Sequence, residues 1–473
     1  MSEENKDIEQ TNGQKDIGDV ADSLGVVFDK PKKKISLSSF VFSAIALILA
    51  AVMTTYACCS AFYKKKYAVE QLEGLNIGTT YDGYDALTLI DAIFKTYGYY
   101  DDIDDEQVAN YVLKAYVAAT GDKHAYYYTD QEYKEMMSAN QGEGEGIGVN
   151  VILSEIPYEG QMISVLEIIA VSPDSPAEEA GLLIGDLVAW VNDGGEKSVT
   201  ELGFYGATDK LKGAVGTKAE FSILRPRSDG TYEKKAFSIE RKNVTYRSVK
   251  SMVSEADASV GILKISSFDI TTPSQLSEEM DALIASGCRK FVFDLRHNPG
   301  GDLNSIRAAL SYFLNEGDLI ISTVDKTGAK EEIKAEPVVY TDPQYTPCNV
   351  SKSDIGKYRG YEFAVLCNEG TASAAELFTA AMRDYGLAEI VGEQTYGKGS
   401  MQRTYPLAMF GCGGALKVTI RLYFPPCGVG YDGVGIVPDR VVELSEAAKQ
   451  YSIYKLPQSL DDQLIAAIGA LNQ

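Results

Sequence analysis

Residues 362–377 read EFAVLCNEGTASAAEL, an apolar run followed by a glycine turn and an alanine-rich stretch. The run from Glu362 to Cys367 is typical of a buried strand, and the residues after it favour a helix that begins near Ser373. Two other segments have a similar order: RKFVFDLRHNPGG at 289–301, which leads into an expected helix over Asp302–Leu314, and VGEQTYGKGSMQ at 391–402. This alternation predicts an α/β core.

Each of the three turns carries a group with chemistry. Ser373 stands where strand becomes helix, near the positive end of the helix dipole, although a lone serine there is ordinarily a helix N-cap. The Pro-Gly-Gly turn at 299–301 offers backbone N–H groups at a helix start, where they can stabilise an oxyanion, although alone it would be a structural turn. Lys398 lies between two glycines, and alone it would be an ordinary surface lysine.

Together the three turns indicate nucleophilic catalysis by serine. A serine hydroxyl needs a base, and the chain has only two histidines, His124 and His297. No obvious carboxylate accompanies His297. A lysine can act as the base if burial lowers its pKa enough to make it neutral, so we favour Lys398. Gln402 could hold that amine by a hydrogen bond, whereas a carboxylate in its place would favour the charged ammonium form.

Residues 142–245 have a different character. The stretch SPDSPAEEAGLLIGDLVAWVN at 172–192 predicts a short helix capped by Ser175, a left-handed cap at Gly181, and a strand over Leu187–Val191. This pattern resembles a PDZ domain, and the resemblance spans about 145–242. It implies that the loop Gly146-Ile147-Gly148-Val149 binds a peptide's terminal carboxylate while the peptide adds as a strand. A PDZ domain used only for packing or regulation is the alternative.

The glycine run that opens this segment, GEGEGIG at 142–148, is not a dinucleotide fingerprint. That motif follows a strand and opens a helix, whereas this run follows an expected helix and opens an expected strand over Ile147–Leu153.

The N-terminal part predicts membrane attachment. Residues 1–34 are polar and charge-rich, as in a disordered tail, and residues 35–63 carry no charge between two lysine clusters. A helix of that length reaches about 43 Å, against about 30 Å of bilayer hydrocarbon. We favour a retained single-pass anchor over a cleaved signal peptide or a core helix, and residues 67–141 read as helical, with Thr129 as an N-cap.

Composition excludes several classes of protein. The net charge of −23 argues against nucleic-acid binding. Two histidines exclude HExxH and three-histidine metal sites. Seven cysteines do not make a disulfide scaffold, and a single disulfide between Cys412 and Cys427 is left open.

These motifs together resemble the carboxyl-terminal processing serine peptidase family over about residues 84–472. Further matching segments are GDKHAYYYTDQEY at 121–133 and GVGIVPD at 433–439, although Lys123-His124-Ala125 stands where the family usually has proline. The resemblance implies a crotonase-like α+β peptidase core and a Ser-Lys dyad. Its implied site residues are Ser373 and Lys398, assisted by Gln402, with the backbones of Gly300 or Gly301 and of Ala374 as oxyanion-hole donors.

We therefore expect a membrane-anchored, extracytoplasmic serine endopeptidase that needs no metal or other cofactor. The expected parts are a cytoplasmic tail (1–34), a transmembrane helix (35–63), a helical segment (67–141), a PDZ domain (142–245) and the peptidase core with its C-terminal helix (246–473). The expected partners are proteins or peptides with apolar C-termini, the membrane and a second copy docked through the helical termini. The alternatives are a membrane-tethered PDZ adaptor without catalysis and an acyl-CoA-binding crotonase relative.

Overall fold

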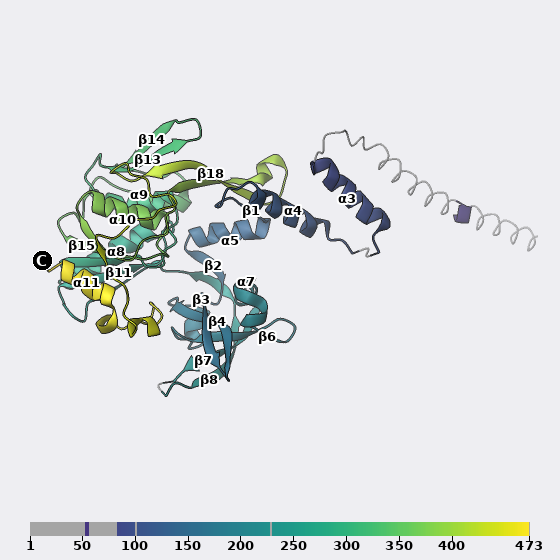
Figure 1. Cartoon of the computed structure of the whole chain (residues 1–473), viewed down its shortest axis with the longest axis horizontal. Coiled ribbons are helices and arrows are strands. Elements are labelled where there is room, and N and C mark those ends of the chain that lie inside the picture. The colour runs from purple at the N-terminus through teal and green to yellow at the C-terminus, as the bar shows by residue number, and fades with distance from the viewer. Residues whose placement is uncertain (1–52, 56–82, 100–101, 228, 473) are drawn as a thin grey trace, which may run out of the picture. The chain divides into compact units, whose positions relative to one another are not determined.

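The computed structural model describes residues 53–55, 83–99, 102–227 and 229–472 (Figure 1). The chain forms two units, Met1–Asp105 and Glu106–Gln473, and the site lies in the second. The expected tail (1–34) and nearly all of the expected membrane helix (35–63) lie outside the described residues. Within the described ranges, no helix combines the length and apolarity needed to cross a membrane.

The described residues from 83 to 141 are mainly helical, as predicted. The helices are α3 (Gly83–Tyr97), α4 (Asp105–Ala119) and α5 (Asp130–Asn140). Thr129 caps α5 in a capping box, in which its hydroxyl accepts from the Glu132 N–H at 3.2 Å and the Glu132 carboxylate accepts from the Thr129 N–H at 2.8 Å. The segment also contains a strand that was not predicted, β1 (Tyr126–Tyr128), because a three-residue aromatic strand is stable only beside the partner that the fold supplies.

Residues 143–245 form a separate group of antiparallel strands. A twisted sheet has the order β3-β4-β5-β7-β8, with β6 on β5, and a two-stranded ribbon joins β2 to β9. The strands are β2 (Glu143–Gly146), β3 (Val149–Tyr158), β4 (Gln161–Val171), β5 (Leu187–Asn192), β6 (Glu196–Ser198), β7 (Lys218–Pro226), β8 (Tyr232–Glu240) and β9 (Lys242–Thr245). The helices are α6 (Pro176–Glu179) and α7 (Val199–Leu211).

Local signals in this group behaved mostly as expected. Ser175 caps α6, Gly181 has a φ of 77°, and β5 begins at Leu187. The glycine run differs from the prediction, because Glu143–Gly146 is itself a strand and the next strand begins at Val149 rather than Ile147. The glycines can pair there because β9 supplies the hydrogen-bonding partner.

The core that carries the site is a six-stranded sheet of order β10-β11-β12-β15-β16-β19. The strand β10 is antiparallel to its neighbour and the others run parallel. Their bounds are β10 (Val249–Val253), β11 (Val260–Ile265), β12 (Lys290–Asp294), β15 (Glu362–Cys367), β16 (Ala388–Gly392) and β19 (Arg440–Val441). The predicted strand over Glu362–Cys367 is confirmed.

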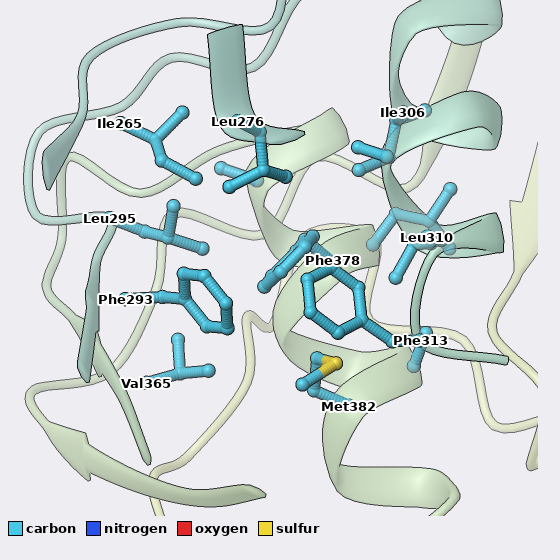
Figure 2. Packing of buried hydrophobic residues seen from close by; sticks show 14 of the residues in the cluster. Ile265, Leu276, Phe293, Leu295, Ile306, Leu310, Phe313, Val365, Phe378 and Met382 are labelled. Atoms are coloured by element: carbon cyan, nitrogen blue, oxygen red, sulfur yellow. The ribbon is translucent and has the colours of Figure 1, made fainter. Parts of the chain in front are cut away.

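Helices cover both faces of this sheet, which explains why its strands are apolar at successive positions. Phe293 packs against Phe313 and Phe378 on one face, beneath α8 (Thr272–Ala285), α9 (Leu303–Ser311) and α10 (Ala374–Asp384) (Figure 2). The neighbouring Val292 faces the opposite side, where α11 (Asp462–Ala470) lies. The order of the strands and both helical layers place the turns after β12, β15 and β16 at one edge.

A second, antiparallel sheet supplies the rest of the site. Its order is β1-β18-β13-β14, with β17 also paired to β18. The bounds are β13 (Leu319–Asp325), β14 (Lys330–Lys334), β17 (Ser400–Pro406) and β18 (Ala415–Phe424). Cys412 and Cys427 are both exposed and unpaired, so the open question of a disulfide between them has a negative answer in this structure.

Candidate active site

The three turns singled out from the sequence lie together. They follow β12, β15 and β16, which are parallel neighbours, so their carboxyl ends meet at one edge of the sheet. The Ala372 N–H donates to the Asn298 carbonyl at 2.9 Å, and the Tyr396 N–H donates to the Thr371 carbonyl at 3.0 Å. Backbone hydrogen bonds therefore join the serine turn to both of the others.

Ser373 occupies a strained backbone conformation. Its φ is 56° and its ψ is −117°, a region that residues with a Cβ rarely adopt and that costs about 1–3 kcal/mol. Such strain persists only where the surroundings compensate for it, and the Ser373 N–H donates to the buried Glu376 carboxylate at 2.9 Å. The conformation is typical of a functional side chain held at a sharp strand-to-helix turn.

Gly300 packs directly against this serine. A Cβ added to Gly300 would lie 2.7 Å from the Ser373 Cβ and 2.7 Å from the Ala374 nitrogen, so no other residue fits without displacing the turn. Its own φ of 96° also favours glycine. The Pro-Gly-Gly turn is therefore built to approach the serine turn closely.

The hydrogen bonds distinguish between the two glycines. The Gly300 N–H already donates to the Asn298 side-chain oxygen at 2.9 Å. Among the hydrogen bonds of the described residues, none uses the N–H of Gly301 or of Ala374. Ala374 is the first residue of α10, whose N–H has no acceptor within the helix. Two backbone donors thus remain available to a ligand within the described residues: the N–H of Ala374, directly after Ser373, and the N–H of Gly301, directly after the Gly300 that packs against Ser373.

Lys398 lies half-buried in the third turn. Burial, followed by the positive charge of Lys417, lowers the pKa of the Lys398 amine, and the more weakly acting Glu376 charge opposes this. Within the described part of the chain, the Lys398 Nζ atom forms no ion pair and no hydrogen bond. The backbone is held firmly, because Tyr423 donates its hydroxyl proton to the Lys398 carbonyl at 2.6 Å. The amine therefore lies in surroundings that disfavour its charged form.

Glu376 joins the serine to the lysine. Its side chain is fully buried, and its Oε2 atom accepts the N–H of Ser373 at 2.9 Å and the N–H of Lys398 at 2.8 Å. Its Oε1 atom accepts the Gly397 N–H at 2.7 Å and the Thr395 hydroxyl at 2.6 Å. One carboxylate thus fixes both backbones. Glu376 is not among the site residues expected from the sequence, although its capping-box spacing from Ser373 was a usable signal.

Gln402 is near the start of β17 and does not contact the lysine amine directly. Its Nε2 atom donates to the Ser400 hydroxyl at 3.0 Å and to the Thr419 hydroxyl at 3.1 Å. No hydrogen bond between Gln402 and Lys398 is present in the described residues. Thr419 in turn donates to Asp122 at 2.8 Å. The segment around Asp122 is not among the site residues expected from the sequence, and nothing in the spacing would have linked it to Gln402.

His297 is not arranged as a base for Ser373. Its Nε2 atom lies 2.9 Å from the Asn368 side-chain nitrogen, and burial lowers the pKa of its imidazole. No hydrogen bond of the described residues connects it to Ser373 or to a carboxylate. His124 is close enough to Lys398 for the lysine charge to affect it, and burial is again the main reason that its pKa is lowered.

The expected peptide-binding loop lies between β2 and β3. The Ile147 carbonyl accepts from the Ala177 N–H at 2.8 Å, and the Gly148 carbonyl accepts from the Ser172 N–H at 2.9 Å. Gly148 has a φ of 89° and packs against Ser175, whereas the Ile147 side chain is buried. The loop from Gly146 to Val149 is thus anchored by its carbonyls. A cavity of about 320 Å³ lies beside it and is lined in part by Val149, Asn150 and Lys134.

Comparisons with known proteins agree on one family. Residues 259–442 match the model of peptidase family S41. The chain is 32% identical over 358 residues to a carboxy-terminal-processing protease of Bartonella bacilliformis, covering 74% of this chain and 73% of that protein. It is 29% identical to the carboxy-terminal processing protease CtpA of Bacillus subtilis, covering 74% and 67%.

One solved structure shows the same fold. It is a Bacteroides fragilis protein assigned to the S41 proteases, with a TM-score of 0.52 and 16% identity, covering 84% of this chain and 98% of that one.

Proposed function

We propose that this chain, which belongs to peptidase family S41 and is a carboxy-terminal-processing serine protease, cleaves peptide bonds with Ser373 as nucleophile and Lys398 as general base. The observation that carries the proposal is the shared Glu376 oxygen, which accepts the backbone N–H of both residues. It supports a fixed pairing of nucleophile and base.

In the acylation step, the neutral Lys398 amine takes the proton of the Ser373 hydroxyl as the oxygen attacks the substrate carbonyl. The lowered pKa of Lys398 supports this role, because a protonated amine has no lone pair to receive the proton. The resulting ammonium then gives its proton to the leaving amine. Water activated by the same lysine hydrolyses the acyl-enzyme and frees Ser373.

The negative charge that develops on the substrate oxygen needs donors. The N–H groups of Gly301 and Ala374 suit this task, since Ala374 follows Ser373 directly, Gly301 follows the Gly300 that packs against Ser373, and neither N–H has a partner within the described residues. Gly300 is the other glycine expected from the family resemblance, and its role in this proposal is to allow the close approach. Gln402 is assigned the role of assisting Lys398 through its side-chain oxygen without adding a charge, because its Nε2 atom is already used by Ser400 and Thr419.

Substrate selection is assigned to residues 142–245 as a PDZ domain. In this proposal the N–H groups of Gly146, Ile147, Gly148 and Val149 bind the terminal carboxylate of a protein with an apolar C-terminus. The carbonyl anchors of the loop support it, because they hold the loop in one conformation before the peptide arrives.

The location proposed for the enzyme is the cell membrane, with a single-pass anchor at 35–63 and the peptidase on the extracytoplasmic side. The motivation is the uncharged run between two lysine clusters. Pairing of two copies through the helical termini is part of the same proposal.

The test is cleavage of an unstructured protein with an apolar C-terminus, followed by mass spectrometry. We expect the parent to cut, and Ser373→Ala and Lys398→Met each to lose at least about a thousandfold in rate, because each removes a group that acts in the chemical step. Lys264→Met is the matched control. Lys264 is also half-buried, with a pKa lowered mainly by burial, but its amine lies over the Tyr454 ring.

Cleavage by Ser373→Ala at the parental rate would refute the serine mechanism. Binding of the apolar tail without cleavage by the parent would instead favour the adaptor function.

A further inference from the structure

Asp122 lies between α4 and β1, outside the three turns that carry Ser373, the oxyanion donors and Lys398. Its carboxylate nevertheless accepts two hydrogen bonds from Thr419 of β18, one from the N–H and one from the hydroxyl, both at 2.8 Å. It also accepts the His124 N–H at 3.0 Å. Burial tends to raise the pKa of Asp122, but these donors outweigh it and leave the pKa below the usual range. The group is an ionised acceptor at neutral pH.

This acceptor determines the direction of the next hydrogen bonds. An ionised carboxylate cannot donate a hydrogen bond, so the Thr419 hydroxyl must donate its only proton to Asp122. The same hydroxyl oxygen can then only accept from Gln402, whose Nε2 lies 3.1 Å away. The second N–H of that amide goes to the Ser400 hydroxyl at 3.0 Å. Both amide protons of Gln402 are therefore used, and its Oε1 atom is the end left for another partner.

We propose that Asp122 and Thr419 are positioning residues that fix the side-chain amide of Gln402, so that it offers Lys398 its carbonyl oxygen and not its NH₂ group. The inference rests on the proposed function, in which Lys398 is the base. An amide NH₂ turned toward the lysine would donate to the lone pair that must receive the Ser373 proton. A carbonyl oxygen leaves that lone pair free.

The inference also explains why the acidic residue acts on the lysine indirectly, through Thr419 and Gln402. A carboxylate beside the amine would favour the ammonium form, whereas one acting through Thr419 and Gln402 orients the amide without that cost. The segment 121–133, to which the sequence alone gave no catalytic role, thereby becomes part of the catalytic arrangement.

The test compares cleavage by the full chain with that of two substitutions. Thr419→Val keeps the branched shape and removes the hydroxyl. Asp122→Asn keeps the size of the side chain. Its oxygen still accepts the Thr419 N–H, so its NH₂ group faces the Thr419 hydroxyl. That hydroxyl then donates to Gln402, and the Gln402 amide must turn its oxygen toward Thr419. We expect each to lower kcat about tenfold while KM changes less than about twofold, because orientation is only part of what a positioned base contributes.

The pH profile separates orientation from general damage. Asp122→Asn reverses the amide and Thr419→Val releases it, and in both cases the carbonyl oxygen that stabilises the ammonium form of Lys398 is no longer held toward it, so we expect the acid limb of kcat to move to lower pH by roughly half a unit in both variants. Thr419→Ser should restore most of kcat and the parental limb. Thr404→Val, on the neighbouring strand, is the matched control, since within the described residues its hydroxyl forms no hydrogen bond.

Several outcomes would overturn the inference. One is an unchanged kcat and acid limb in Thr419→Val and Asp122→Asn while Ser373→Ala and Lys398→Met are inactive; the proposed function would then stand without it. A second is that both variants lose activity and melt at a lower temperature while the acid limb of kcat stays at the parental pH, which would indicate only structural damage. Cleavage by Ser373→Ala at the parental rate would remove both proposals.

Discussion

Two carboxylates hold this site from different directions. Glu376 belongs to the helix that follows the nucleophile, is fully buried, and accepts three backbone N–H groups and a hydroxyl. Asp122 comes from a distant segment and is linked to Gln402 through Thr419. Glu376 determines where the backbones of Ser373 and Lys398 lie, whereas Asp122 determines which way side-chain hydrogen bonds run.

Neither carboxylate hydrogen-bonds to the lysine amine in the described structure. A carboxylate in contact with Lys398 would stabilise the ammonium and raise its pKa, which opposes its use as a base. A carboxylate can therefore organise such a site without stabilising the ammonium form of the lysine, if it accepts hydrogen bonds from backbone N–H groups and hydroxyls.

Among the residues that surround the nucleophile and the base, the largest effect is expected at Glu376. Glu376→Gln keeps the size but turns an NH₂ group toward buried donors, leaving them unpaired. We expect a loss of about 2–4 kcal/mol in the free energy of unfolding and at least about a hundredfold in cleavage rate. Urea unfolding and a cleavage assay measure the two.

The matched control for Glu376→Gln is Glu389→Gln. Glu389 forms a part-exposed ion pair with Arg440, so we expect this substitution to lower the free energy of unfolding by less than about 1 kcal/mol. Equal effects of the two substitutions would contradict the special role of Glu376.

A third carboxylate, Asp294, extends the comparison because a charged guanidinium holds it in addition to a backbone N–H, both from Arg296. Burial alone would raise the pKa of Asp294, but Arg296 outweighs burial and lowers that pKa to about 2, against about 3.9 unfolded. A lowered folded pKa means that the stabilisation is present above pH 4 and is lost as the pH falls toward 2, and we expect about 2 kcal/mol.

Unfolding free energies of the parent and of Asp294→Asn, measured at pH 6 and at pH 2, test this prediction. The difference between them should shrink at pH 2. A constant difference would show that the Asp294 charge is not what stabilises the fold.

The smallest effect is expected at Lys417, whose positive charge lowers the pKa of Lys398. Lys417→Met removes that charge, so the Lys398 pKa should rise and the acid limb of kcat/KM should move to higher pH, by roughly a few tenths of a unit. This shift is opposite in sign to the one expected for Thr419→Val. A shift to lower pH would mean that another group sets the limb.

Local signals in the sequence were sufficient for much of the fold. The strand over Glu362–Cys367, the caps at Thr129 and Ser175, and the left-handed turn at Gly181 each depend on a few adjacent residues, and the structure contains all of them. The strand β1 was missed, since it exists through its pairing with β18.

The candidate site divides in the same way. Ser373, Lys398 and the glycines could be named because each stands in a recognisable turn. The sequence could not show that Gly301, and not Gly300, has a free N–H, because this depends on the Asn298 side chain, which accepts the Gly300 N–H. We expected Gln402 to hydrogen-bond to the lysine amine. In the structure its side-chain nitrogen donates to Ser400 and Thr419.

The sequence by itself determined the family, the strand-turn-helix units and the residue types that make a serine and a lysine chemically useful. These properties are local, since composition and spacing within a dozen residues are enough to establish them. Only the tertiary structure decided that one Glu376 oxygen serves both backbones and that Asp122 acts on Gln402 through Thr419. A hydrogen bond depends on distances of about 3 Å between atoms whose separation in the chain carries no information about their separation in space.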